Sequence, residues 1–220
     1  MSTSNLMMSN GYFSPALQSF PNDNIDVLKM KTRVLQEQLE QAVVFSQILS
    51  SKITLLQYFK VMCKFYMSYT QVEKRVLNFE SKISLSHAAP YKTRLPSLES
   101  ELSDIAYKLN VRLPIPPSKY LVTGNGSTLE KYWGIRYALD SFSQTAKMVF
   151  PKIESTLGHE HQLNLAFWKK LIEVDDDWTR TNAAINSINV DNIERSELVQ
   201  CAQETFILVS ENMAGTESFL

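Results

Sequence analysis

From residue 25 onward, the chain consists of long segments in which apolar residues recur three and four positions apart. This spacing places apolar side chains on one face of an α-helix, whereas a half-buried β-strand alternates apolar and polar residues, and no segment shows that alternation clearly. The chain has 220 residues, of which 44% are hydrophobic and 20% are charged, so it can bury a core of its own. The sequence therefore predicts a single all-α domain.

Capping and helix-breaking residues set the expected helix boundaries. Residues 1–22 are rich in Ser, Asn and Met and lack a helical period, so we expect a flexible N-terminal extension followed by a helical domain at 23–215. Asp23 and its Asn neighbours can cap the first helix, a proline cluster ends the third, and Gly124 and Gly126 predict a kink in the fourth. The expected helices span 25–49, 54–79, 97–109, 118–150, 162–187 and 190–213.

Two of these helices have clear apolar faces. The first should bury one stripe, formed by Leu28, Thr32, Leu35, Leu39 and Ala42. The second should turn an aromatic-rich face inward, formed by Leu55, Phe59, Met62, Tyr66, Tyr69 and Leu77. We expect these two faces to pack on each other and to form part of the core.

Composition and charge argue against several classes of protein. The formal net charge is -1 and no block of Lys and Arg could follow a phosphate backbone, so nucleic acid is not an expected partner. No run of about eighteen apolar residues and no signal-peptide pattern occurs, so we expect neither export nor a membrane span. Cys63 and Cys201 are isolated within helical segments, which favours two packed thiols in the reducing cytoplasm.

One polar stripe on the first predicted helix is a candidate functional site. Lys29, Arg33, Gln36 and Glu40 are spaced four, three and four residues apart, so they share a face about 100° from the apolar stripe. Taken alone, two cations, an amide and a carboxylate are typical of a solvated helix face. The surrounding sequence favours a functional interpretation.

Residues 28–40 resemble the proximal-helix motif of heme oxygenases, in which Leu, a basic residue, Thr, a basic residue, His and a later Glu recur at this spacing. The resemblance implies a heme oxygenase-like multi-helix bundle. It places Gln36 where the family has its iron-binding histidine, with Lys29 and Arg33 facing the heme propionates and Glu40 where the family's acid orients the imidazole. Gln36 offers only a neutral carbonyl oxygen, which is a weaker iron ligand, and Glu40 loses the N–H group that it would orient.

A second segment, residues 120–129, resembles the distal helix of bacterial heme oxygenases, where Gly-Ser-Thr-Leu is followed by two glycines. The resemblance assigns Gly124, Gly126 and Ser127 to the heme face, where glycine lets a helix backbone lie close to a ligand. An ordinary helix break is the alternative interpretation. Glu130 and Lys131 replace the two following glycines, and bulky charged side chains there should alter oxygen access. Residues 94–102 and 202–206 also resemble the bacterial branch of the family.

The three histidines offer few metal sites. His87 lies in a connector between helices and could act as a substitute axial ligand, although an ordinary loop residue is the simpler interpretation. His159 and His161 are two residues apart, so on a helix they point to different faces, and we expect both at the surface. No Glu-x-x-His pair of a di-iron oxidase occurs.

Three functions remain open from the sequence. The favoured hypothesis is a protein that binds heme or a related tetrapyrrole between the proximal and distal helices, with ring opening weakened or lost because Gln36 replaces histidine. The first alternative is an active heme oxygenase with unusual iron ligation, which would convert heme to biliverdin, CO and iron with electrons from a reductase or ferredoxin. The second alternative is a scaffold that binds a partner and no heme.

Overall fold

The computed structural model describes residues 23–83, 90–115, 129–173, 175–189 and 191–215, and these residues form helices and connections without a β-strand. A short π-helix, η1 (Glu154–Gly158), follows directly after α5. The α-helices are α1 (Asn24–Glu40), α2 (Val43–Ile48), α3 (Leu55–Glu80), α4 (Leu95–Leu109), α5 (Leu129–Ile153), α6 (His159–His161), α7 (Ala166–Glu173), α8 (Asp175–Ser187) and α9 (Asn192–Ala214).

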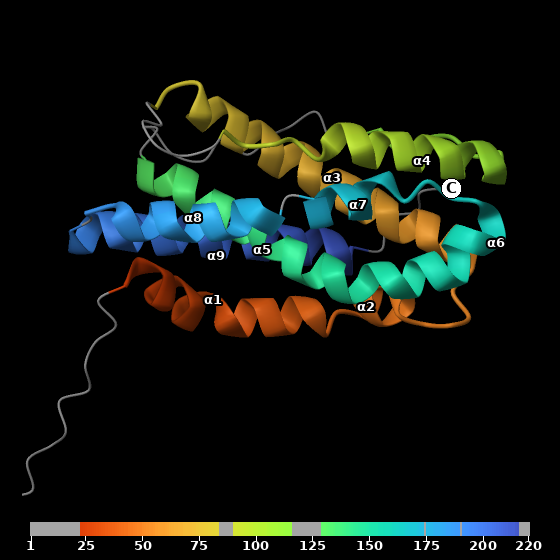
Figure 1. Ribbon diagram of the computed structural model, residues 1–220, viewed down its shortest axis with the longest axis horizontal. Coiled ribbons are helices and arrows are strands. Elements are labelled where there is room, and N and C mark those ends of the chain that lie inside the picture. The colour runs from red at the N-terminus through yellow and green to blue at the C-terminus, as the bar shows by residue number, and fades with distance from the viewer. Residues whose placement is uncertain (1–22, 84–89, 116–128, 174, 190, 216–220) are drawn as a thin grey trace, which may run out of the picture.

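The bundle is built around α5 and α9, which pack on each other along their length. In Figure 1, α1 and α2 run along one side of this central pair, while α3 and α4 cover the opposite side. α8 packs on α5, and α9 contacts α1, α3 and α5. The arrangement confirms the predicted all-α class and leaves α1 on the outside of the bundle, opposite α5.

A glycine sets the close approach of the two central helices. A Cβ at Gly134 of α5 would overlap with the backbone oxygen of Leu198 and would also press on Cys201 of α9. Only glycine leaves room for this contact between the helix backbones. Cys201 and Cys63 are buried free thiols, as predicted, and burial raises the pKa of Cys201 to about 11.

The start of α1 follows the prediction, but its end does not. Asp23 caps the helix, since its carboxylate accepts the N–H of Ile25 at 2.9 Å. The single helix predicted over 25–49 is wrong in being continuous, because α1 ends at Glu40, Ala42 has an extended backbone with ψ 144, and the chain resumes as the separate helix α2. After this turn, α2 buries Phe45 in the core.

The second predicted helix is confirmed as α3, but it packs mainly on α4, α9 and α5 instead of on α1 as expected, and one residue of its predicted buried face is wrong. Thr54 and Gln57 form a capping box at its start. Phe59 and Tyr69 are buried as expected, but Leu77 is 45% exposed and Val76 takes its place in the core. The predicted buried stripe is therefore displaced by one residue at the end of α3. The helix is so long that one fixed spacing between apolar residues cannot follow its buried face throughout.

The predicted helix over 162–187 begins too early. Gln162 and Leu165 have left-handed backbones, with φ 51 and φ 48, so a right-handed helix cannot include them. The helix therefore begins at Ala166, where Asn164 accepts the backbone N–H of that residue at 3.0 Å.

A buried ionic cluster joins α5 to the segment before α4. Asp140 pairs with Arg94 and with Arg136, the latter at 3.0 Å, and it accepts the hydroxyl of Thr181 at 2.7 Å. Burial opposes ionisation of Asp140, but the two arginines outweigh it and hold the pKa of this carboxyl below its usual value. Glu73 of α3 accepts the backbone N–H of Arg94. These charges fix the position of α5 in the bundle.

Within the described residues, no helix combines the length and the apolar character that a membrane crossing needs.

Candidate functional site

The residues of α1 fall into three groups that differ in how deeply their side chains are buried. Leu28 and Thr32 are completely buried against the bundle, while Lys29 and Glu40 are exposed. Gln36 is half-buried between these two groups. A polar amide at such a position can contact both the protein interior and a ligand that reaches it from solvent.

An open groove runs beside this edge of α1, and its volume is about 240 Å³. The lining residues are Lys29, Gln36, Leu39 and Glu40 of α1, Phe45 of α2, Tyr137, Ser141, Phe142, Gln144, Thr145 and Met148 of α5, Trp178 of α8 and Phe206 of α9. Phe45, Phe142 and Phe206 are buried and give the groove an aromatic floor, whereas hydroxyl, amide and charged groups form its rim. Such a combination suits a flat, largely apolar ligand with polar groups at its edge.

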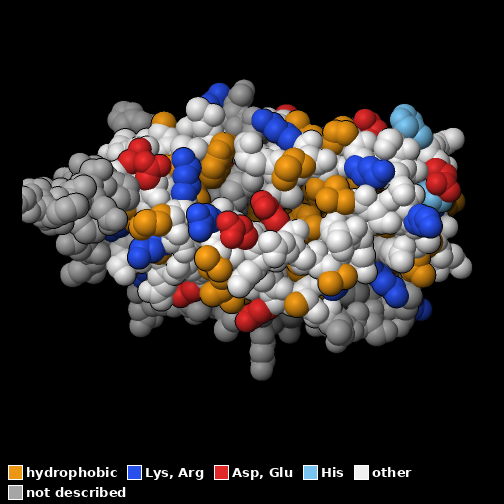
Figure 2. All heavy atoms as spheres, turned by 90° about the horizontal axis from the view of Figure 1, so that it is seen from below, with side chains coloured by type: hydrophobic (Ala, Val, Ile, Leu, Met, Phe, Trp, Pro, Cys, Tyr) orange, Lys and Arg blue, Asp and Glu red, His pale blue; other side chains and the backbone are white. Residues whose placement is uncertain are grey.

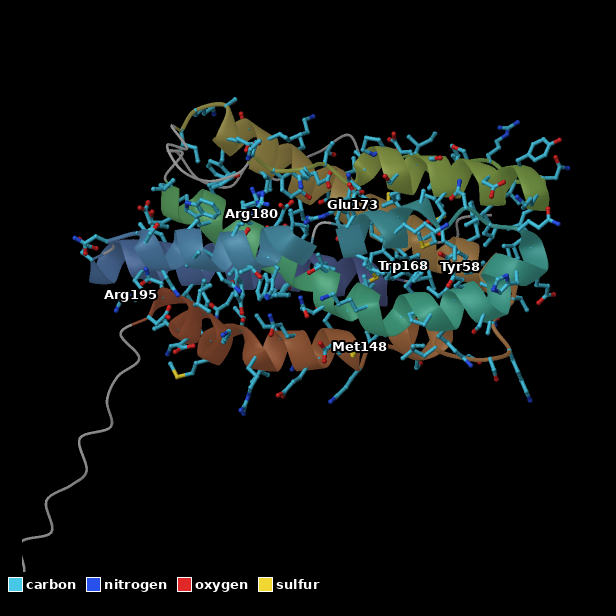
Figure 3. All side chains as sticks on the ribbon, in the orientation of Figure 1. Tyr58, Met148, Trp168, Glu173, Arg180 and Arg195 are labelled. Carbon is cyan, nitrogen blue, oxygen red and sulfur yellow. The ribbon has the colours of Figure 1, made fainter. Side chains whose placement is uncertain are left out.

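Figure 2 looks at the molecule from the side on which α1 lies. Cationic, anionic and hydrophobic side chains are mixed on this face, with no field of one sign. Met148 is 64% exposed and, in Figure 3, lies near the end of α1 that leads to α2. Its thioether therefore belongs to the outer rim of the groove.

The structure brings together three of the four residues of the predicted stripe. Lys29, Gln36 and Glu40 all line the groove. Arg33 is absent from its lining; its side chain is 74% exposed and pairs with Glu37 at 3.4 Å. At 100° per residue, Arg33 lies about 60° around the helix from Gln36, so its side chain starts from the solvent edge of the stripe.

The amide of Gln36 reaches across to α5. Its Nε2 donates to the phenol oxygen of Tyr137 at 3.5 Å, and the hydroxyl of Thr32 lies 3.4 Å from the same oxygen. The hydroxyl of Thr32 already donates to the carbonyl of Leu28 at 2.8 Å, so its oxygen is the acceptor for the Tyr137 proton. A directed chain therefore runs from Gln36 through Tyr137 to Thr32.

Tyr137 is held firmly at this point. Its ring contacts Trp178, at 5.4 Å between centroids, and Phe206, at 6.4 Å with the rings nearly perpendicular. Burial raises the pKa of Tyr137, and the hydrogen bonds with Thr32 and Gln36 offset part of that rise. The phenol is therefore neutral at ordinary pH.

Several predicted site residues lie outside the described residues, namely His87, Gly124, Gly126 and Ser127. The part of the distal segment that is described begins with α5 at Leu129. Lys131, which the resemblance to heme oxygenases aligned with a glycine, points away from the groove and pairs with Glu197 of α9 at 3.7 Å. It lines a different pocket, together with Arg75 and Glu204.

The donor set of the groove fits a tetrapyrrole but not imidazole ligation. Its described lining offers two amides, two hydroxyls, a phenol, a carboxylate and a thioether, and contains neither His nor Cys. Lys29 at the rim can pair with a ligand carboxylate. His159 and His161 lie at α6, away from the groove, and the described residues contain no group of three or more potential metal ligands.

Sequence reasoning missed the groove residues on α5, α8 and α9. Tyr137, Trp178 and Phe206 are the most important of these, because they meet Gln36 or form the floor beneath it. They are separated from Gln36 by 101 or more residues. A single sequence gives the face of each helix but not which faces meet, so no local signal could have identified them.

Comparison with known proteins agrees at the level of the fold. No family model matches the sequence, and no curated protein matches it. Among solved structures, the NO- and CO-bound heme oxygenase from Neisseria meningitidis is similar with a TM-score of 0.59 and 15% sequence identity. The match covers 89% of this chain and 95% of that chain. The chain therefore has the all-α fold of a heme oxygenase-like multi-helix bundle.

Proposed function

We propose that this protein binds heme or a related tetrapyrrole in the groove between α1 and α5, with ring opening weakened or lost. The observation that carries the proposal is the groove itself, which places Gln36 at its inner edge, Lys29 at its rim and an aromatic floor beneath. Lys29 and Glu40 are eleven residues apart, so the groove follows α1 for about 16 Å, which is long enough for a flat macrocycle. The similarity to a heme oxygenase structure agrees with this ligand class.

Weak or absent ring opening follows from the side chains that the groove offers to the heme iron. Heme supplies iron, and in an oxygenase that iron needs a basic ligand whose second nitrogen is hydrogen-bonded by a neighbouring acid. The amide of Gln36 is neutral and engages Tyr137 instead. Lys29 and the aromatic floor can still bind the carboxylates and faces of a tetrapyrrole, because neither interaction depends on iron ligation.

Titration with ferric heme, followed by the Soret absorption, tests the proposal. We expect saturable 1:1 binding by the parent protein and at least about tenfold tighter binding by Gln36→His, because an imidazole there lies one turn before Glu40. The matched control is Gln38→His, which adds an imidazole to the exposed face of the same helix and should leave the affinity unchanged.

Two results would contradict the proposal. Absence of saturable binding by the parent protein would remove the tetrapyrrole site. Formation of biliverdin by the parent protein with a suitable reductase would show that ring opening is intact, in favour of the active heme oxygenase.

A further inference from the structure

The groove has two hydrogen-bond acceptors on its α1 side. Nε2 of Gln36 donates to Tyr137, while the carbonyl oxygen of the same amide has no partner among the described residues. That oxygen is not one of the buried atoms that lack a partner, so a ligand in the groove can reach it. The carboxylate of Glu40 also lines the groove, and no described residue pairs with it. Both groups can therefore accept a hydrogen bond from a bound molecule.

The two acceptors lie on the same edge of the groove, because residues four apart on an α-helix have side chains about 5–6 Å apart on one face. An imidazole at residue 36 would donate its second N–H to Glu40, but the amide of Gln36 donates to Tyr137 instead. A ligand that covers these acceptors without donating to them removes their water and gives no hydrogen bond in return, which costs free energy. A ligand with N–H groups at this edge avoids that cost.

Heme and an open-chain tetrapyrrole differ in the hydrogen bonds that they can donate. The four nitrogens of heme are bound to iron, and its edge carries carboxylates and hydrocarbon, so heme presents no N–H group to an acceptor. A closed ring without metal keeps its N–H groups at the centre of the ring and in its plane, where an acceptor on a groove wall meets them with poor geometry. An open chain has N–H groups at its end rings, and rotation between the rings can turn them toward the protein.

We propose that the groove between α1 and α5 prefers an open-chain tetrapyrrole to heme, with the carbonyl oxygen of Gln36 and the carboxylate of Glu40 accepting hydrogen bonds from its N–H groups. This inference rests on the proposed function and names the ligand class of the same site. The aromatic floor and Lys29 bind the faces and a carboxylate of either ligand. The described lining contains neither His nor Cys, so heme gains no imidazole or thiolate bond to offset the cost of covering the acceptors.

Titrations of the parent protein with biliverdin, ferric heme and metal-free protoporphyrin, each followed by the absorption of the ligand, test the inference. Biliverdin is an open-chain tetrapyrrole, whereas the other two ligands are closed rings with and without a metal. The parent protein should bind biliverdin at least about tenfold more tightly than either closed ring, because two hydrogen bonds distinguish them.

Variants of the two acceptors test their role in this preference. Gln36→Leu removes the amide oxygen without adding an iron ligand, and Glu40→Ala removes the carboxylate. Each should lower the ratio of biliverdin affinity to heme affinity about fivefold, the effect of one lost hydrogen bond. The matched control is Glu37→Ala, which removes an exposed carboxylate that pairs with Arg33 outside the groove and should leave the ratio unchanged.

The outcomes separate this inference from the proposed function. If ferric heme binds as tightly as biliverdin, or more tightly, the inference is wrong while tetrapyrrole binding stands. If metal-free protoporphyrin binds as tightly as biliverdin, the groove distinguishes ligands by the metal and not by the open chain, which also overturns the inference. An unchanged ratio in both Gln36→Leu and Glu40→Ala overturns the assignment of the acceptors. If none of the three ligands binds, both proposals are wrong.

Discussion

Glu101 is a buried carboxylic acid at the junction of α3, α4 and α7, and its replacement by glutamine should change how stability depends on pH. Its carboxylate accepts the hydroxyl of Tyr58 and the backbone N–H of Phe167, the latter at 2.8 Å. Tyr58 in turn accepts the indole N–H of Trp168 at 2.7 Å, and Figure 3 shows these two rings side by side. The site is fully enclosed, with Glu101 at 0% exposure.

Burial raises the pKa of Glu101 from 4.5 to about 7, although its hydrogen bonds to Tyr58 and Phe167 oppose the rise. A raised pKa in the folded state means that the folded protein binds this proton more tightly than the unfolded chain. The resulting stability is fully present below pH 4.5 and is lost as the pH rises through 7. A pKa of about 7 in place of 4.5 corresponds to about 3 kcal/mol of stability, most of which should disappear between pH 5 and pH 8.

Urea unfolding of the parent protein and Glu101→Gln at half-unit steps from pH 5 to pH 8 measures this effect. The free energy of unfolding of the parent, relative to that of Glu101→Gln, should fall by about 2–3 kcal/mol over the range, since all other groups titrate in both proteins. Glu99→Gln, which removes an exposed carboxylate from the same helix, is the matched control. Parallel curves for the parent and Glu101→Gln would show that Glu101 has the same pKa in the folded and the unfolded protein.

Three further predictions concern the packing of α5 and the limits of the groove. Gly134→Ala should destabilise the protein by about 2 kcal/mol, because its Cβ would overlap with backbone of α9, whereas Gly215→Ala meets only ordinary contacts and should be nearly neutral in urea unfolding. Asp140→Ala leaves Arg94 and a second buried arginine without their shared counter-charge, so the same assay should show a loss of about 3–5 kcal/mol; a loss below about 1 kcal/mol would contradict the role of the cluster. Lys131→Ala should leave heme affinity unchanged, because the side chain points to α9, and a large change in the Soret titration would show that it reaches the ligand.

Much of the fold could be predicted from the sequence, because helical periodicity and capping act over short distances. The cap at Asp23 and the capping box at Thr54 are local hydrogen bonds that the sequence encodes directly. The predicted helix boundaries were wrong where tertiary contacts determine the backbone conformation. Burial of Phe45 accompanies the turn after α1, and the left-handed residues Gln162 and Leu165 carry no recognisable turn signal.

The candidate site was predictable only on its α1 side. The spacing of Lys29, Gln36 and Glu40 requires them to share a face, and all three line the groove. The opposite wall depends on how α5, α8 and α9 pack, which no spacing within α1 can indicate. For that reason the sequence alone suggested that Gln36 was the metal-facing residue, whereas its contact with Tyr137 became visible only in the structure.

A crystal structure of the protein grown with ferric heme would show directly whether the groove between α1 and α5 holds a tetrapyrrole. We expect one macrocycle in the groove between α1 and α5, lying over the aromatic floor, with a carboxylate near Lys29. A groove that remains filled only by protein side chains at saturating heme, or a macrocycle bound elsewhere on the bundle, would contradict it.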